Sequence, residues 1–187
     1  MILDGLLQFT SSTGGGTGNG DSPTAIGSTA SANQLDLHLA TGSGIPVLAS
    51  GQGARDIGIG DDPAMKLLVL VTAAFTTGAG GTLSVQLQGS PDNGSGAPLG
   101  FVTYYQTPVY AVATLVAGAR LMDMDVPRPP AGVAEPRFLQ LNYVIATGVM
   151  TGGTIKAWIV LDRHDEFYNS TINSIIGGYP PGVTIAN

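Results

Sequence analysis

Short segments of alternating hydrophobic and polar residues run through most of the chain. The segment from Asn33 to Leu39 is the clearest example, because Leu35, Leu37 and Leu39 alternate with polar residues. Such alternation places the leucines on one face of a strand and the polar side chains on the other. No segment repeats its hydrophobic residues with the 3.6-residue period of a helix. The pattern therefore predicts an all-β protein.

Seven further strands are expected, separated by loops rich in glycine and proline. They are Lys66–Phe75, Thr82–Gln88, Leu99–Tyr105, Val109–Val116, Arg120–Val126, Arg137–Ile145 and Thr154–Leu161. The glycine loop between the first two predicts a β-hairpin. About eight short strands without an internal repeat are typical of a jelly-roll-like antiparallel β-sandwich.

The two ends of the chain differ from its centre. Residues 1–31 begin with a short apolar segment and continue in a glycine-rich stretch in which Ile26 is the only large apolar residue. Residues 163–187 carry many apolar side chains in a sequence broken by glycine and proline. We therefore expect an N-terminal arm and glycine-rich loop at 1–31, a β-sandwich domain at 32–162 and a C-terminal arm at 163–187.

Apolar side chains in the two arms are the candidate assembly residues, since exposed apolar patches usually mark a contact surface. They are Ile2, Leu3, Leu6, Leu7 and Phe9 in the N-terminal arm, and Phe167, Tyr168, Ile172, Ile175, Ile176, Tyr179, Pro180, Pro181, Val183 and Ile185 in the C-terminal arm. The sequence leaves open whether the C-terminal arm folds back on the domain or docks on another chain.

Charged residues are unusually scarce, at 11% of the chain, against about a quarter in ordinary soluble proteins. Between Leu67 and Ala119, Asp92 is the only charged residue, and its neighbours place it in a turn. An antiparallel sheet that faces water normally carries charges on its outer face. The central strands are therefore either covered on both faces or directed toward a partner protein.

Composition also excludes several classes of protein. The net charge of −6 has the wrong sign for a surface that binds phosphates, so no nucleic-acid partner is expected. The longest apolar run, Leu67 to Phe75, is too short to cross a membrane. The absence of cysteine excludes a disulfide scaffold. Asp4 lies where an export signal would carry basic residues, so no such signal is expected.

The sequence shows no constellation of catalytic residues. Only two histidines are present, His38 and His164, and neither has the partners that nucleophilic catalysis or a metal site requires. The cluster 162–166 is best interpreted as a solvated strand exit, and Asp123 and Asp125 as the wet face of a strand. Asp61 and Asp62 are a further pair of carboxylates, of the kind that glycosidases use. We therefore expect no enzyme activity, no metal and no cofactor.

Several segments resemble the capsid cement, or decoration, proteins of tailed bacteriophages of the Bordetella-phage type. The resemblance lies in Arg55–Pro63 leading into Lys66–Val71, in Leu83–Ser90, in Pro136–Tyr143, in Thr154–Asp162 and in the ends Met1–Asp4 and Tyr179–Asn187. The glycine-rich stretch 14–20 and the tail after Leu161 depart from the shorter family pattern.

This resemblance implies a non-enzymatic structural protein of the virion. Such a protein would be made in the host cytoplasm and would bind the outer surface of an icosahedral head, where it bridges subunits of the major capsid protein. Further copies of the chain, in a homodimer or homotrimer, are the other expected partner. The alternative is a carbohydrate- or receptor-binding β-sandwich from a phage tail or a secreted lectin, with Tyr104, Tyr105 and Tyr110 as the candidate binding residues.

Overall fold

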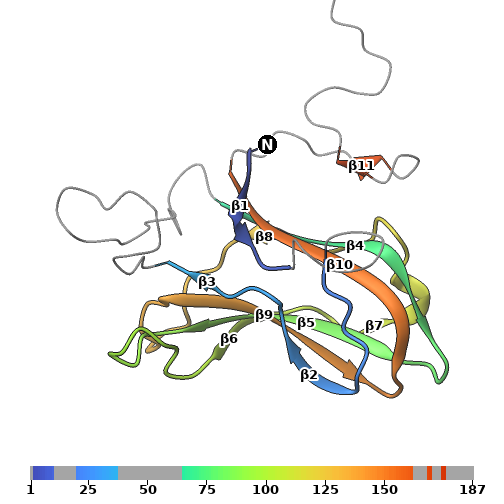
Figure 1. Cartoon of the computed structure of the whole chain (residues 1–187), viewed down its shortest axis with the longest axis horizontal. Coiled ribbons are helices and arrows are strands. Elements are labelled where there is room, and N and C mark those ends of the chain that lie inside the picture. Colours follow the sequence, from blue (N-terminus) through green and yellow to red (C-terminus); the bar gives the residue numbers. More distant parts are fainter. Residues whose placement is uncertain (1, 11–19, 38–64, 162–167, 170–173, 176–187) are drawn as a thin grey trace, which may run out of the picture.

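The computed structural model describes residues 2–10, 20–37, 65–161, 168–169 and 174–175. These residues form antiparallel strands and one short 3₁₀ helix, and the two larger sheets lie one above the other (Figure 1). The prediction of an all-β antiparallel sandwich is confirmed. The more specific jelly-roll connectivity stays a prediction.

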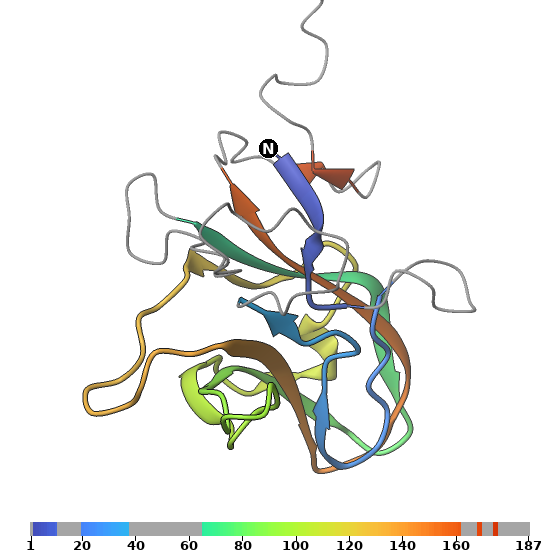
Figure 2. The same cartoon turned by 60° about the vertical axis from the view of Figure 1, so that its left-hand side comes forward.

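Four strands form the upper sheet of Figure 1, in the order β1-β10-β4-β8. Their bounds are Ile2–Gln8 for β1, Met150–Leu161 for β10, Lys66–Thr77 for β4 and Arg120–Asp125 for β8. Figure 2 shows β1, in dark blue, beside the end of β10, in orange. The pairing of β1 with β10 joins two parts of the chain that are far apart in sequence.

Six strands form the lower sheet, in which the order is β2-β9-β5-β6, β3 also pairs with β9 and β7 with β5. Their bounds are Gly27–Ala30 for β2, Phe138–Ala146 for β9, Thr82–Ser90 for β5, Val102–Gln106 for β6, Leu35–Asp36 for β3 and Tyr110–Ala111 for β7. The 3₁₀ helix η1 (Val112–Thr114) follows β7, and the short strands β11 (Tyr168–Asn169) and β12 (Ser174–Ile175) pair with each other.

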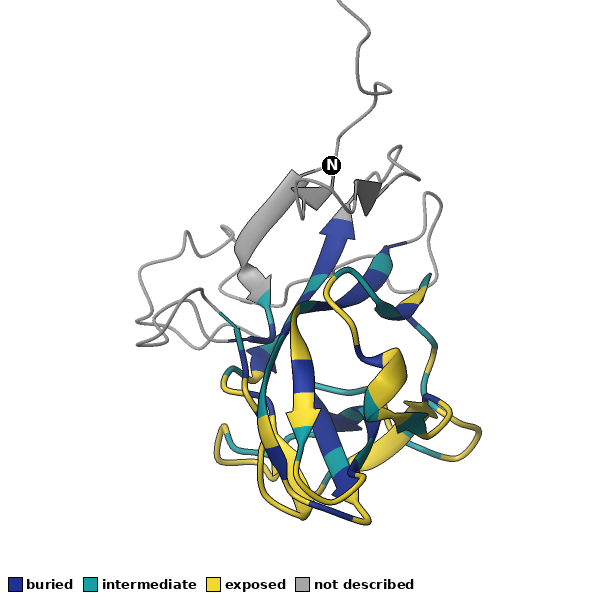
Figure 3. Ribbon diagram, turned by 90° about the vertical axis from the view of Figure 1, so that its right-hand side faces the viewer, coloured by how far each residue is buried: buried dark blue, intermediate teal, exposed yellow. Residues whose placement is uncertain are grey.

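The hydrophobic core contains the inward-facing residues of both sheets, and Figure 3 shows these buried positions alternating with exposed ones along the strands. Buried and exposed positions alternate because successive side chains of a strand point to opposite faces of the sheet. The largest fully buried side chains are Phe9, Leu67, Leu68, Leu83, Leu87, Leu115, Leu139, Leu141, Tyr143, Ile145, Ile155 and Ile159.

The predicted hairpin between β4 and β5 is wrong, because the two strands lie in different sheets. The loop at 78–81 instead crosses from one sheet to the other, as does the loop between β9 and β10. These two loops touch: a Cβ atom at Gly81 would lie 2.6 Å from the carbonyl oxygen of Gly148. The crossing lets Phe75 of β4 and Leu83 of β5 both enter the core.

The described N-terminal residues take part in both sheets. The described part of 1–31 contributes β1 to one sheet and β2 to the other. Phe9, predicted as an assembly residue, is fully buried in the core, and its backbone amide donates a 3.0 Å hydrogen bond to the carbonyl of Ala157. Pairing with β10 and β9 satisfies the backbone groups of this segment, which explains why it joins the domain.

Two predicted strands are shorter in the structure. The segment Val109–Val116 contains only the two residues of β7 before the chain turns into η1. The segment Asn33–Leu39 contributes β3, and Leu35 and Leu37 are buried as its alternation predicts. His38 and Leu39 lie outside the described residues.

Candidate assembly surface

Four exposed apolar side chains lie on β6 and on the loops at its two ends. The exposed fractions are 69% for Leu99, 41% for Val102, 36% for Tyr105 and 64% for Val109. We call these four residues the apolar strip. The sequence from 93 to 119, which contains the strip, has no charged residue. The strip therefore combines apolar exposure with a stretch of sequence that carries no charge.

The strip lies at an edge of the lower sheet. β6 pairs with β5, and no other described strand pairs with it. β8, an edge strand of the upper sheet, carries Arg120, Asp123 and Asp125. There Arg120 pairs with Asp123 at 2.9 Å, and Lys66 pairs with Asp125. Charged side chains at an edge discourage pairing with a further strand, and β6 lacks this protection.

The inner side of β6 is firmly anchored. The ring of Tyr104 packs over Gly89, where a Cβ atom would lie 2.3 Å from it. The Tyr104 hydroxyl is buried without a hydrogen-bond partner, and burial raises the pKa of this group, as does the negative charge of Glu135. Just after β6, the amide of Thr107 donates to the carbonyl of Val85 at 2.9 Å. β6 is thus fixed along β5, while no described strand pairs with its other edge.

Side-chain amides occupy the outer face of the same sheet. Gln140 Nε2 donates to Gln88 Oε1 at 2.9 Å, and Gln86 Nε2 donates to Gln106 Oε1 at 2.8 Å. Further bonds join the other members into one connected set. We call it the amide network; its members are Gln34, Gln86, Gln88, Gln106, Gln140 and Asn142. The network covers this face with neutral donors and acceptors.

An ion-pair cluster closes one end of this face. Arg137 donates to both carboxylate oxygens of Asp36, at 2.9 and 3.0 Å, and also to Asp92. The hydrogen bond with Asp36 is the main cause that raises the pKa of Arg137. Desolvation acts to raise the pKa of Asp92, but hydrogen bonds from Arg137, Gly96 and Gly94 together outweigh it and lower this pKa. Through Asp92, the cluster holds the loop between β5 and β6, which contains Leu99 of the strip.

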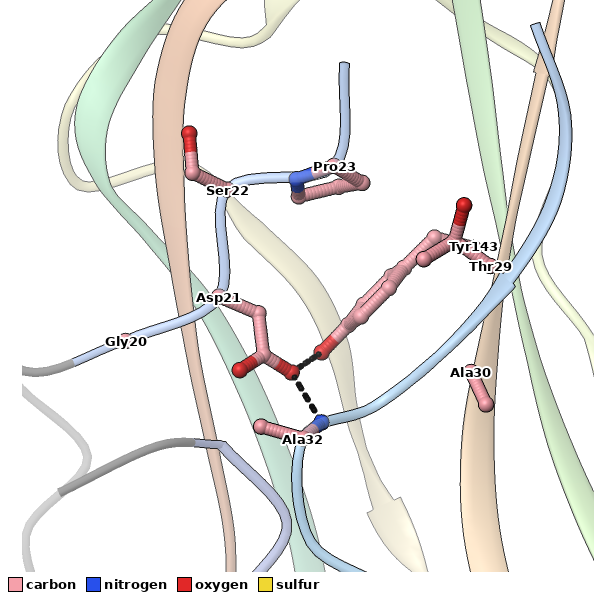
Figure 4. Close-up of a pocket in the computed structure, with 8 residues that line it drawn as sticks. All are labelled: Gly20, Asp21, Ser22, Pro23, Thr29, Ala30, Ala32 and Tyr143. Carbon is pink, nitrogen blue, oxygen red and sulfur yellow. Dashed lines mark hydrogen bonds between the residues drawn. The ribbon is translucent and has the colours of Figure 1, made fainter. Parts of the chain in front are cut away.

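A cavity of about 230 Å³ opens between residues 20–32 and β9 (Figure 4). Within it, the Tyr143 hydroxyl donates to Asp21 Oδ2 at 2.9 Å, and the amide of Ala32 donates to the same oxygen at 3.0 Å. Burial raises the pKa of Tyr143 well above its usual value, and Asp21 raises it further. These contacts fasten the N-terminal segment to the lower sheet.

The predicted assembly residues fall into three groups. Ile2, Leu3, Leu6 and Leu7 belong to β1, Tyr168 to β11 and Ile175 to β12. Phe9 is part of the core and offers no surface to a partner. The others lie outside the described residues: Phe167, Ile172, Ile176, Tyr179, Pro180, Pro181, Val183 and Ile185.

The sequence pattern alone does not identify the apolar strip. Its signal was present, because the segment from Leu99 to Tyr105 has apolar residues on both faces of the predicted strand and no charge. A pattern of this kind is also typical of a strand that is buried on both faces. Only the pairing scheme shows that β6 is an edge strand.

Among the residues that the structure describes, no three His, Cys, Asp or Glu side chains are grouped as metal ligands. His38, His164, the pair Asp61 and Asp62, and the cluster 162–166 lie outside those residues. Asp123 and Asp125 are exposed and paired with basic residues, in agreement with the predicted solvated face. No helix in the described part of the chain is long and apolar enough to cross a membrane.

Comparison with known protein families gives a match to most of the chain. No curated protein matches the chain significantly. Residues 21–159 match Bbp16, a family of Bordetella phage proteins. The matched region runs from Asp21, which is fastened to β9, to Ile159 of β10. Because the match covers well over half of the chain, this protein belongs to the Bbp16 family of phage proteins.

Proposed function

We propose that the protein is a capsid cement protein, which binds the outer surface of an icosahedral phage head and bridges subunits of the major capsid protein. The observation that carries this proposal is the match of residues 21–159 to a phage protein family. The exposed, uncharged apolar strip supports it, because such patches usually mark contact surfaces. Homodimers or homotrimers of the chain on the shell belong to the same proposal.

The binding energy would come from many small apolar contacts. Burial of one exposed leucine or valine side chain contributes about 1.5–3 kcal/mol, and part of this offsets the entropy lost on binding. A protein that contacts two capsid subunits at once gains further affinity, because the second contact forms within one complex. The apolar strip and the C-terminal arm are the surfaces that we assign to these contacts.

Binding to purified, expanded heads of the same phage tests the proposal, with sedimentation of heads and bound protein as the readout. Deletion of residues 166–187, or the double change Leu99→Lys and Val109→Lys, should each weaken binding by about tenfold or more. Val116→Lys is the matched control, because Val116 is 53% exposed but lies outside the strip. Circular dichroism verifies that each variant is folded. If the full chain does not bind heads, the proposal fails.

The alternative, a carbohydrate-binding surface, has one observation in its favour. The amide network offers neutral donors and acceptors on one sheet face, which suits sugar hydroxyl groups. Of the three candidate tyrosines, Tyr104 and Tyr110 pack against the core, and Tyr105 is exposed. Glycan-array binding that is lost in Gln88→Ala would favour this function. An empty array together with binding to heads would discard it.

A further inference from the structure

The loop between β5 and β6 contains the pair Asn93 and Gly94, and both residues are exposed. In an Asn–Gly pair, the backbone nitrogen of the glycine can attack the Cγ carbon of the asparagine side chain. The attack forms a C–N bond and expels ammonia, which leaves a cyclic succinimide. Water then opens this ring to give aspartate or isoaspartate. The reaction thus consumes one water molecule, releases one ammonia and replaces an amide with a carboxylate.

Steric hindrance does not protect this pair. Glycine has no side chain to obstruct the attack, and the φ angle of Gly94 is +86°, in the region that favours glycine. A Cβ atom built at Gly94 would have no neighbour within 4 Å. The pair is therefore open to water, and any protection of Asn93 must come from the hydrogen bonds of the loop.

The attacking nitrogen of Gly94 is held by a carboxylate. It donates a 2.9 Å hydrogen bond to Oδ1 of Asp92, and the amide of Gly96 donates to the same oxygen at 3.0 Å. A backbone amide attacks only after it has lost its proton, and the negative charge that then forms would be repelled by the Asp92 carboxylate. The hydrogen bond to Asp92 therefore keeps the proton on Gly94 and opposes the attack.

Arg137 holds the Asp92 carboxylate in this position. It donates to Oδ2 of Asp92, and it is itself bound to both carboxylate oxygens of Asp36. Desolvation alone would raise the pKa of Asp92, but hydrogen bonds from Arg137 and from two loop amides lower it on balance. A carboxylate with a lowered pKa is a weak base. Asp92 therefore accepts the hydrogen bond of Gly94 without removing its proton.

The side chain of Asn93 is also held within the loop. Its Oδ1 atom accepts hydrogen bonds from the amide of Ser95, at 2.8 Å, and from the amide of Ala97, at 3.4 Å. The backbone amide of Asn93 donates to the carbonyl of Ala97 at 3 Å or less, at 2.9 Å. These bonds restrict the motions by which the Cγ carbon could approach the Gly94 nitrogen, so both reacting groups are constrained.

We propose that Asn93 is a deamidation site and that the hydrogen bond from Gly94 to Asp92 controls its rate. The folded loop protects Asn93, and loss of this bond makes it reactive. The product places a carboxylate in the stretch 93–119, which otherwise carries no charge. This inference concerns the free protein and does not depend on the proposed cement function. The two are tested on different samples, so the failure of one leaves the other untouched.

Peptide mapping by mass spectrometry provides the test, on full-length protein kept folded in mildly alkaline buffer. It follows the conversion of Asn93 to aspartate and isoaspartate with time. Asp92→Ala removes the acceptor of the Gly94 amide, while Arg137 keeps its two bonds to Asp36. Asn93 should then convert about tenfold faster than in the parent protein. Equal rates would overturn the proposal, as would a slower rate, which would show that Asp92 acts as the base.

Ser90→Ala is the matched control for a general loosening of the loop. Ser90 Oγ accepts a 3.0 Å hydrogen bond from the amide of Gly100, and this bond does not involve the Asp92–Gly94 contact. Its removal should leave the conversion rate of Asn93 unchanged. An increase as large as that in Asp92→Ala would show that mobility of the whole loop sets the rate, and the proposed role of Asp92 would be wrong.

Unfolding controls for the effect of residue 92 on the local sequence. In concentrated guanidinium chloride the hydrogen bonds of the loop no longer form. The parent protein and Asp92→Ala should then convert Asn93 at equal rates, and the parent should convert faster than when it is folded. A difference between the two proteins that persists in the denaturant would arise from the neighbouring side chain alone and would contradict protection by the fold.

Discussion

Replacement of Tyr143 by phenylalanine should destabilise the protein through a single lost hydrogen bond. The Tyr143 side chain is 1% exposed, and its hydroxyl donates to Asp21 Oδ2 at 2.9 Å. Phenylalanine fills nearly the same volume, so the packing in the core is retained. After the change, the amide of Ala32 remains as a donor to the same oxygen, at 3.0 Å. The substitution therefore removes a single hydrogen bond between residues 20–32 and β9, and leaves the other contacts in place.

The expected cost follows from the burial of this contact. A hydrogen bond to a charged group contributes about 1.5–3 kcal/mol to stability. Asp21 is only 9% exposed, so water can replace the lost donor only in part. We therefore expect a decrease of about 2 kcal/mol in the free energy of unfolding. For a chain of this size that corresponds to a decrease of roughly 4–8 °C in the melting temperature.

Urea unfolding followed by circular dichroism measures this cost, with an unchanged m-value as evidence that the folded structure is retained. Tyr110→Phe is the matched control, since its hydroxyl makes a longer bond, 3.4 Å, to the carbonyl of Leu121. We expect that control to lose less than about 0.5 kcal/mol. An equal decrease in the free energy of unfolding in both variants, or no decrease in Tyr143→Phe, would refute the stabilising role of the Tyr143–Asp21 hydrogen bond.

The same contact predicts a dependence on alkaline pH. Burial, and then Asp21, raise the pKa of Tyr143 in the folded protein well above its usual value. In the unfolded chain the hydroxyl ionises near pH 10. The folded state therefore binds the proton more tightly than the unfolded state does. The stability that this contributes is lost as the pH rises above about 10. The stability difference between the parent protein and Tyr143→Phe should narrow in that range.

Two further changes probe how β6 and its loop are fixed. Gly89→Ala should destabilise by about 1–3 kcal/mol, because the new Cβ atom would meet the Tyr104 ring at 2.3 Å; thermal unfolding measures this, and Gly100→Ala, with open space around it, should be nearly neutral. Arg137→Met should lower the urea midpoint at neutral pH, because Arg137 bonds to two carboxylates. Since the pKa of Asp92 is lowered in the fold, this loss should disappear as the pH falls well below 4. A loss that persists unchanged at pH 2 would contradict the ionic origin.

Strand positions in the centre of the chain are predictable because they depend on local alternation. The expected strand Arg120–Val126 corresponds to β8, and the expected strand Arg137–Ile145 corresponds to β9 with a shift of one residue at each end. In β9, the core residues Leu139, Leu141, Tyr143 and Ile145 occupy every second position, and in β8 the exposed Asp123 and Asp125 flank Met124. Period-2 patterns report which face is buried, so they identify strands without knowledge of their partners.

Strand partners are not predictable in this way. The glycine loop after β4 suits a hairpin, but it serves as a crossing between sheets because it packs against Gly148, far away in the sequence. β1 likewise joins the upper sheet through β10, near the other end of the described chain. The exposure of the strip depends on the same long-range choice, since β6 is exposed only because no described strand lies beyond it.

The scarcity of charge in the central strands has two separate causes within the fold. In β4, the five residues from Leu67 to Val71 are all buried, so this strand is covered on both faces. In β5, the outward residues Gln86 and Gln88 belong to the amide network, which makes that face polar without charge. Neither strand needs a partner protein to explain its composition. The apolar strip has neither explanation, because its four side chains are exposed and none of them belongs to the amide network.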